Sequence, residues 1–200
     1  MHHPQLAQSN IPAITLGLAN RPEPRYAEAM PGPFHPSVNS WKDLVVFPGW
    51  GKQDADDRSM TFAATIDIGG VTIPNLWFRG RCIEDQPDRE VIFQLEVGKD
   101  GARTRVPLMR VDWRPLSGGH ANVKGPPDLI NTYIEGSHFH SFIVNWLEEE
   151  QRMRTTNLPV AVKISEPLQS FSELLDFVKI QFRINGIERV TEPEWVQELF

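Results

Sequence analysis

Cysteine is almost absent from this chain, which has a single thiol, Cys82, among 200 residues. One cysteine cannot form an internal disulfide, so a disulfide-stapled extracellular scaffold is excluded, and we expect a reducing, cytoplasmic setting. Long apolar runs are also missing, because no window approaches the roughly 18 apolar residues that a membrane span needs. The start, MHHPQLAQSN, has no basic stretch followed by an apolar one, so we expect no signal peptide.

The chain also lacks an excess of positive charge, since 20 Lys and Arg face 26 Asp and Glu and the net charge is −6. This balance argues against a protein that coats nucleic acid or an anionic membrane by charge alone. Glycine-rich phosphate loops are missing, because GWGK at 49–52 lacks the P-loop spacing. Ser137 and Ser141 have no G-x-S-x-G context, and we expect Cys82 to be a small core residue.

Proline, in contrast, is abundant at the start of the chain. Eight of the 17 prolines lie in the first 48 residues. Each removes a backbone donor and favours an extended predecessor, so we expect neither a helix nor a central strand before about residue 60. We therefore predict a proline-rich extended arm over residues 1–58. Its apolar segment WKDLVVFPGW, residues 41–50, would anchor it on its own domain or on a partner.

Alternating apolar residues begin at Met60 and predict strands. Phe62, Ala64, Ile66 and Ile68 alternate before Gly69-Gly70, which is a hairpin signal. Further extended segments follow in VTIPNLWFRGRCI, EVIFQLEV and TRVPLMRVDW. Together they predict a four-strand antiparallel meander over residues 60–114.

The rest of the chain mixes short extended pieces with a late helix. A loop at 114–128 precedes two extended pieces around Gly136-Ser137, then a short helix or charged loop at 147–157 and a strand at 158–165. The Ser170–Glu173 spacing predicts a helix start, and Thr191-Glu192-Pro193-Glu194 predicts a second helix through Phe200. The fold class that follows is α+β: residues 59–200 form one domain. In it a curved antiparallel sheet, either a meander or a partial barrel, is packed by a C-terminal helix.

Three histidines are the candidate catalytic residues: His120, His138 and His140. His138 and His140 are two residues apart in a predicted strand, so their side chains leave the same face. Their Cα atoms would be about 6.5 Å apart. His120 lies in a loop that could close over them. Three interpretations stay open: a zinc ion bound by all three imidazoles, metal-free acid–base catalysis, or ordinary hydrogen-bonded strand histidines.

Arginines and one asparagine complete the candidate site. Arg79 and Arg81 share one strand face, and Arg110 shares another with Asp112. Guanidinium forks bind phosphate bidentately, so we assign Arg79, Arg81 and Arg110 to substrate binding and expect Asn122 to position substrate from the loop.

The sequence pattern from Arg110 to Trp146 resembles a group of small bacterial and prophage proteins of unknown function. The shared features are the R-x-D motif at 110–112, H-x-N at 120–122, H-x-H at 138–140 and an amphipathic helix at 171–184. The resemblance implies an origin in a mobile element, where toxins and defence proteins are common, and it implies no particular reaction.

Two functional hypotheses from different classes result. The first is a small intracellular phosphodiesterase or RNase-like protein that acts on RNA or another phosphate-containing substrate by histidine acid–base catalysis, without a bound metal. The second is a non-enzymatic interaction protein, an inhibitor, antitoxin or anti-defence factor. It would bind a protein partner, or a second copy of itself, through the arm and an acidic surface.

Overall fold

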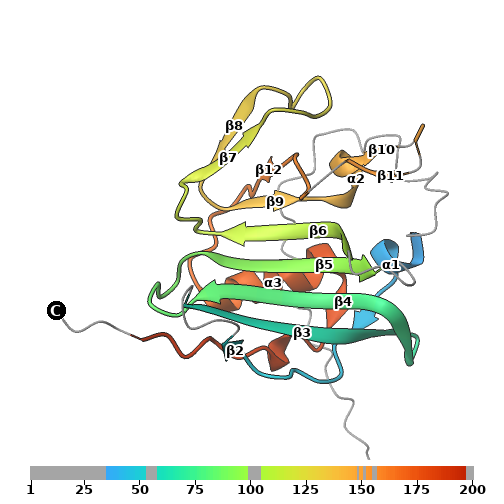
Figure 1. Ribbon diagram of the computed structural model, residues 1–200, viewed down its shortest axis with the longest axis vertical. Coiled ribbons are helices and arrows are strands. Elements are labelled where there is room, and N and C mark those ends of the chain that lie inside the picture. Colours follow the sequence, from blue (N-terminus) through green and yellow to red (C-terminus); the bar gives the residue numbers. More distant parts are fainter. Residues whose placement is uncertain are drawn as a thin grey trace, which may run out of the picture. The chain divides into compact units, whose positions relative to one another are not determined.

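The computed structural model describes residues 35–52, 58–98, 105–147, 149–150, 152–154 and 157–196, and these belong to one compact unit that spans residues 31–200. Most of the predicted arm, and with it the proposed contact to a partner, lies outside the described residues. The described part is built on one large sheet with a helix across one face (Figure 1). No helix within these ranges is long and apolar enough to cross a membrane.

The predicted meander is confirmed as four long antiparallel strands. They are β3 (Ser59–Ile68), β4 (Val71–Ile83), β5 (Val91–Gly98) and β6 (Arg105–Trp113). Burial alternates along most of β3, β4 and β5, and in β5 Val91, Phe93 and Leu95 are fully buried on one face. This period of two is the signal from which the sequence predicted them.

Short strands extend the sheet on both sides of the meander. On the β6 side they are β9 (His138–His140) and β12 (Val162–Lys163), and on the β3 side they are β1 (Lys42–Asp43), β13 (Ile184–Asn185) and β2 (Gly51–Lys52). The order is β12-β9-β6-β5-β4-β3-β1-β13, with β2 also paired to β3, and only the β1–β13 pair is parallel. The sheet is open and does not close into a barrel, and the predicted antiparallel meander forms its centre.

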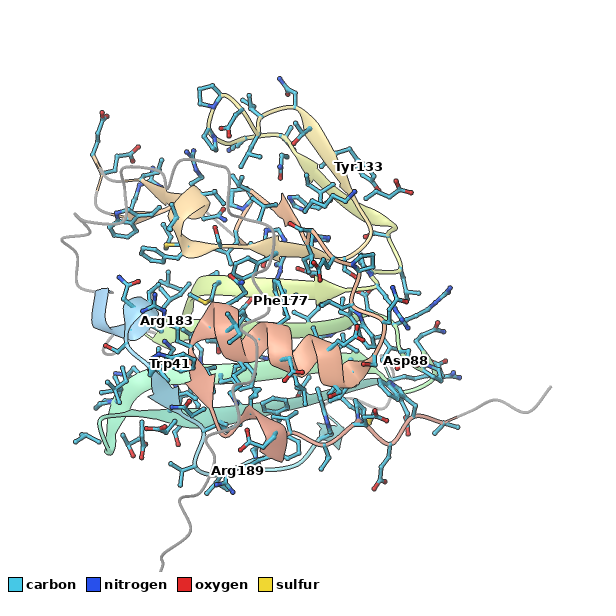
Figure 2. All side chains as sticks on the ribbon, turned by 180° about the vertical axis from the view of Figure 1, so that it is seen from behind. Trp41, Asp88, Tyr133, Phe177, Arg183 and Arg189 are labelled. Atoms are coloured by element: carbon cyan, nitrogen blue, oxygen red, sulfur yellow. The ribbon has the colours of Figure 1, made fainter. Side chains whose placement is uncertain are left out.

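The C-terminal helix is confirmed as α3 (Phe171–Phe182). The Ser170 hydroxyl accepts from the Glu173 amide at 3.2 Å, and the Glu173 carboxylate accepts from the Gln169 amide at 2.6 Å, so both ends of the predicted capping spacing are used. Figure 2 shows α3 lying against one face of the sheet, with Phe177 on the side near β9. The Phe177 and Phe139 ring centroids are 5.5 Å apart.

The core lies between α3 and the sheet and is rich in phenylalanine. Phe78 stacks on Phe93 with centroids 5.5 Å apart, and Phe182 from α3 packs edge-on against Phe78. Gly80 leaves space for a further ring of this core, that of Phe62, because a Cβ at position 80 would lie 2.2 Å from it. Cys82 is fully buried in the core, as predicted, and burial raises the pKa of its thiol to about 12.

Two further predictions for the chain ends are wrong. Before residue 60 the structure has the helix α1 (His35–Asn39) and the internal strand β1, because the backbone of 42–44 pairs with that of 183–185. After Thr191 no helix forms through residue 196, because the Val196 amide donates to the Glu84 carbonyl at 2.9 Å and extends this segment. Residues 41–50 do anchor on their own domain, since Trp50 packs against Phe62 and donates to the Thr191 carbonyl.

The middle of the chain forms small hairpins and turns. The described residues of the segment at 147–157 form no helix, which leaves the charged-loop alternative, and they include parts of two paired strands of two residues each. The strand predicted at 158–165 is reduced to β12. The remaining elements are β7 (Gly119–Asn122), β8 (Thr132–Glu135), α2 (Phe142–Asn145), β10 (Trp146–Leu147), β11 (Arg152–Met153) and the 3-10 turn η1 (Ile187–Arg189).

Candidate functional site

His138 and His140 lie side by side on β9, and both are buried, with 3% and 0% of their surface exposed. Their register partners on β6 are Asp112 and Arg110, so all four side chains leave the same face of the sheet. This is the face opposite to α3, because the intervening residue Phe139 packs on that helix. The predicted shared face of the two histidines is therefore present.

The extended piece predicted after Gly136-Ser137 is short, because the strand β9 ends at His140. Beyond His140 the chain turns into α2 instead of extending through Phe142, Val144 and Trp146. The side chain of Asn145 explains the turn, because its amide donates to the Val160 carbonyl at 2.8 Å and its oxygen accepts from the Val160 amide at 3.0 Å. A buried asparagine paired with a main-chain segment in this way fixes the local path of both.

His120 reaches the same place from the hairpin β7–β8. The side chain of Asn122 docks this hairpin, since its amide and oxygen pair with the carbonyl and amide of Ala161 at 2.9 and 2.8 Å. The ring centroid of His120 then lies 5.4 Å from that of His138 and 4.7 Å from that of His140, and the latter two are 5.0 Å apart. The three histidines therefore converge in space. We call these three residues the histidine cluster.

Each ring of the histidine cluster is anchored to a main-chain carbonyl through one nitrogen. His138 Nδ1 lies 2.8 Å from the Gly136 oxygen, His140 Nδ1 lies 3.1 Å from the Val160 oxygen, and His120 Nε2 lies 3.1 Å from the Pro159 oxygen. A carbonyl only accepts, so these nitrogens carry hydrogen and the other nitrogen of each neutral ring presents a lone pair. Ligating histidines are held in this way in metal sites.

Asp112 and Arg110 add one negative and one positive charge beside the rings. Asp112 Oδ2 accepts from Arg110 Nε at 2.7 Å and lies 3.3 Å from His140 Nε2 and 3.6 Å from His138 Nε2. Arg110 Nη2 also lies 2.8 Å from His140 Nε2, where it donates to the ring lone pair. The two charges compensate each other within a site that is nearly closed to water.

Burial sets the protonation states of this site. Burial lowers the pKa of His140 to about 4 and also lowers the pKa of His138, and in both cases the nearby Asp112 carboxylate opposes the shift. Burial alone would raise the pKa of Asp112, but the contact with His140 and the charge of Arg110 lower it to about 2. At neutral pH His138 and His140 are therefore uncharged, while Asp112 is ionised.

The donor set suits a transition metal ion. One nitrogen from each ring of the histidine cluster lies within 4.8 Å of the other two. Zinc bonds of about 2.0–2.1 Å at tetrahedral angles place neighbouring ligand atoms about 3.4 Å apart. The distances of 3.3 and 3.6 Å from Asp112 Oδ2 to the two imidazole nitrogens match that edge, so Asp112 is a fourth candidate ligand.

The predicted substrate-binding residues divide into two groups. Register pairing runs from His140 through Arg110 and Gln94 to Arg79, and from His138 through Asp112 and Ile92 to Arg81, so all three arginines share the face of the histidine cluster. Arg79 and Arg81 are three strands away from His140 and His138, about 14 Å at the usual strand spacing. Asn122 is buried, and its amide is committed to Ala161 and Thr132, which leaves it a structural role.

Sequence reasoning missed the residues that hold the site together. Asn157 accepts from Arg110 Nη1 at 2.9 Å, and the carbonyls of Pro159 and Val160 orient two of the rings. The position of a main-chain carbonyl cannot be predicted from residue types, and Asn157 lies in a segment with no periodic pattern. Only Asp112, which follows Arg110 at a spacing of two, had a local signal.

Comparisons with known proteins give no relative: no protein-family model, no curated protein and no solved structure matches this chain. The resemblance to small bacterial and prophage proteins therefore stays a prediction, as does the mobile-element origin that it implies.

Proposed function

We propose that this protein is a metal-dependent phosphodiesterase in which the histidine cluster binds one divalent transition metal ion, with zinc as the first candidate. The observation that carries the proposal is the anchoring of all three rings to main-chain carbonyls while one nitrogen from each converges within 4.8 Å. Three imidazoles with a further oxygen position are a common donor set of catalytic zinc.

A hydrogen-bonded core network without metal explains this arrangement less well. Without a metal, the unprotonated nitrogens of His138 and His120 would face a shared space, and no N–H or O–H group among the described residues donates to them. A cation placed between the rings satisfies these lone pairs, and the ionised Asp112 compensates part of its charge. The carboxylate therefore favours a metal in this position.

The reaction that fits the site is hydrolysis of a phosphodiester. Zinc-bound water has a pKa of about 7, so the site would supply hydroxide near neutral pH, and zinc accepts a fifth ligand in some catalytic sites. A bound metal ion would supply this hydroxide, and the water proton would go to solvent. In the hydrolysis the hydroxide oxygen would form a bond to phosphorus while one P–O ester bond breaks, and the leaving alkoxide would take a proton from solvent. Arg110 lies beside Asp112 and His140, where its guanidinium would stabilise the charge on the phosphoryl oxygens.

Metal-free acid–base catalysis is the second candidate. It is favoured by the contact of Asp112 with both His138 and His140, since a carboxylate that orients an imidazole is a common arrangement for a general base. Against it, both histidines are uncharged at neutral pH, so neither is an imidazolium that could protonate the leaving oxygen, and the one N–H of each ring is bound to a main-chain carbonyl.

The test combines metal analysis with cleavage of a mixed RNA pool. Protein purified without chelator is expected to contain about one zinc per chain and to cleave RNA, and chelation is expected to stop cleavage until zinc is restored. The His138→Gln/His140→Gln double variant should lose both metal and cleavage, whereas His35→Gln, a histidine outside the cluster, should keep both.

Two results would contradict the proposal in different ways. Cleavage that survives chelation and disappears in the double variant would overturn the metal and leave metal-free catalysis. Metal bound without cleavage of RNA or of a generic phosphodiester would overturn the enzyme and leave a metal-binding protein.

A further inference from the structure

We infer that the sheet face carrying the histidine cluster binds single-stranded nucleic acid along a path from Arg105 to the cluster. This inference names the substrate class of the proposed phosphodiesterase and rests on that function for the cleavage step. Binding of the strand is independent of the proposed function.

The first support is the charge of this face. Over β4, β5, β6, β9 and β12 this face carries five cationic side chains and two carboxylates, a surplus of three positive charges, although the whole chain carries −6. These residues are Arg79, Arg81, Arg105, Arg110, Lys163, Glu96 and Asp112. Two more carboxylates, Asp43 and Asp67, lie on the same face at its other end, on β1 and β3. An acidic protein that concentrates cations on one side of a sheet attracts a polyanion there, while the remaining surface repels it.

The second support is a groove of about 950 Å³ on the same face. Gly51 lines one end, Arg79, Gln94 and Arg105 line the floor, and Asn157 lines the far end. Asn157 also accepts from Arg110 Nη1 at 2.9 Å, and Arg110 contacts His140. The groove therefore ends one side chain away from the histidine cluster.

Two arginines in the groove are positioned by a buried carboxylate. Glu96 is 2% exposed and accepts from Arg105 at 2.5 Å, while Arg79 lies 3.5 Å from it. One carboxylate thus holds two guanidiniums whose side chains remain about one-third exposed. Their outward N–H groups are oriented before a ligand arrives, which lowers the entropy lost on binding a phosphate.

An aromatic ring completes the binding surface. Trp77 is the register partner of Glu96, so it leaves the same face, and the Arg105 guanidinium lies 4.8 Å from its ring centroid. Planar guanidinium and indole groups of this kind stack on nucleotide bases. A phosphopeptide would use the cations but would leave this stacking surface unused.

The shape of the site favours a single strand over a duplex. His138 and His140 are at most 3% exposed, so a phosphate must enter the face to reach them. An unstacked strand can bend its backbone inward and place its bases on aromatic side chains, whereas a stiff duplex presents its phosphates on a cylinder. A groove of about 950 Å³ holds a few nucleotides of one strand.

The experiment measures binding of full-length protein to a fluorescent oligouridine of about 16 nucleotides, with chelator present to prevent cleavage. The Arg81→Gln/Lys163→Gln variant removes two charges of this face, while Glu96, its two arginines and the three histidines keep their side chains. Lys163 is the register partner of His138, and glutamine preserves the length of most of its side chain. Loss of two phosphate contacts should reduce the affinity about 25-fold at 0.1 M salt and flatten the salt slope by about 1.4. Arg189→Gln, on the side of the molecule shown in Figure 2, should change neither.

Each outcome of this experiment decides one point. Absence of binding, equal losses in the double variant and in Arg189→Gln, or equal affinity for a duplex of the same length would overturn the inference. Strand binding by a protein that contains no metal and cleaves nothing would overturn the proposed function alone. Metal-dependent cleavage of a small phosphodiester without strand binding would overturn this inference alone.

Discussion

Arg110 donates from Nη2 to His140 Nε2 at 2.8 Å and so occupies a lone pair that a metal ion would need. The same guanidinium also holds Asp112 through Nε and Asn157 through Nη1. Metal binding has to displace only the Nη2 contact, because the other two do not involve a ring nitrogen. Arg110 therefore competes with the metal ion for the lone pair of His140 Nε2, and it also neutralises the charge of Asp112, the carboxylate that would bind the ion.

Replacing Arg110 by glutamine should strengthen metal binding. The variant removes the donor on His140 and a positive charge beside the site, so we expect zinc affinity to rise about tenfold, which corresponds to about 1.4 kcal/mol. The pKa of His140 should also rise, since the Arg110 charge contributes to lowering it. Competition with a zinc indicator measures the first effect and NMR titration of the ring the second. Weaker zinc binding in the variant would show that Arg110 mainly positions Asp112.

Zinc should stabilise the fold. An ion that binds only the folded chain at 100 times its dissociation constant adds about 2.7 kcal/mol. For a domain of this size that raises the Tm by about 5–10 °C. His120→Gln should lose most of this shift, while His35→Gln should retain it. A shift of equal size in both variants would place the ion elsewhere.

Acid should destabilise the metal-free protein in a defined window. Burial lowers the pKa of folded His140 to about 4, so between about pH 6.5 and pH 4 the unfolded chain binds more protons. The free energy of unfolding therefore falls as the pH drops through this window, by about 3 kcal/mol for this group. Asp112, with a pKa lowered to about 2, adds a further loss below about pH 4. Arg110 and His138, which also face His140, oppose its protonation.

Urea unfolding across this pH range measures the effect. His140→Gln has no ring to titrate, so its stability should vary less between about pH 6.5 and pH 4 than that of the wild type. Parallel curves for the two proteins would mean that His140 is not responsible.

Removing the Asn122 side chain should separate the hairpin β7–β8 from the site. Asn122→Ala leaves the amide and carbonyl of Ala161 without partners, so we expect a loss of about 2–4 kcal/mol in stability and weaker zinc binding through His120. Thr132→Val removes the third contact of Asn122 and the hydrogen bond from the Thr132 hydroxyl to the Leu129 carbonyl at 2.6 Å, and should cost about 1–2 kcal/mol without undocking the hairpin. Calorimetry and zinc titration of both variants test this, and an unchanged zinc affinity in Asn122→Ala would contradict it.

The sequence predicted what local periodicity controls. The alternation at Phe62 and Ala64 located the meander, and the capping pair Ser170 and Glu173 located α3, because both signals act within a few residues. The same period of two placed His138 and His140 on one face. Convergence with His120 was beyond reach, since it depends on the pairing of Asn122 with Ala161, 39 residues further along the chain.

Tertiary contacts overrode local signals at the chain ends. Lys42 is fully buried in β1, where its ammonium donates to the carbonyls of Val38 and Ser40, and burial lowers its pKa to about 7. Nothing in a proline-rich segment predicts such a lysine. Pro193 marks a good helix start, but the contact of Val196 with Glu84 extends the chain instead.

The parallel pairing of β1 with β13 joins Lys42 to Ile184 and Asp43 to Asn185. During synthesis β1 leaves the ribosome long before its partner exists, and closing a loop of this length is slow. The outer edge of β1 therefore stays uncovered until residues 184–185 emerge, although β1 can already pair with β3 and the meander can already form. An exposed strand edge is a template for wrong pairing, so the interval between these two events is when the nascent chain is most prone to aggregate.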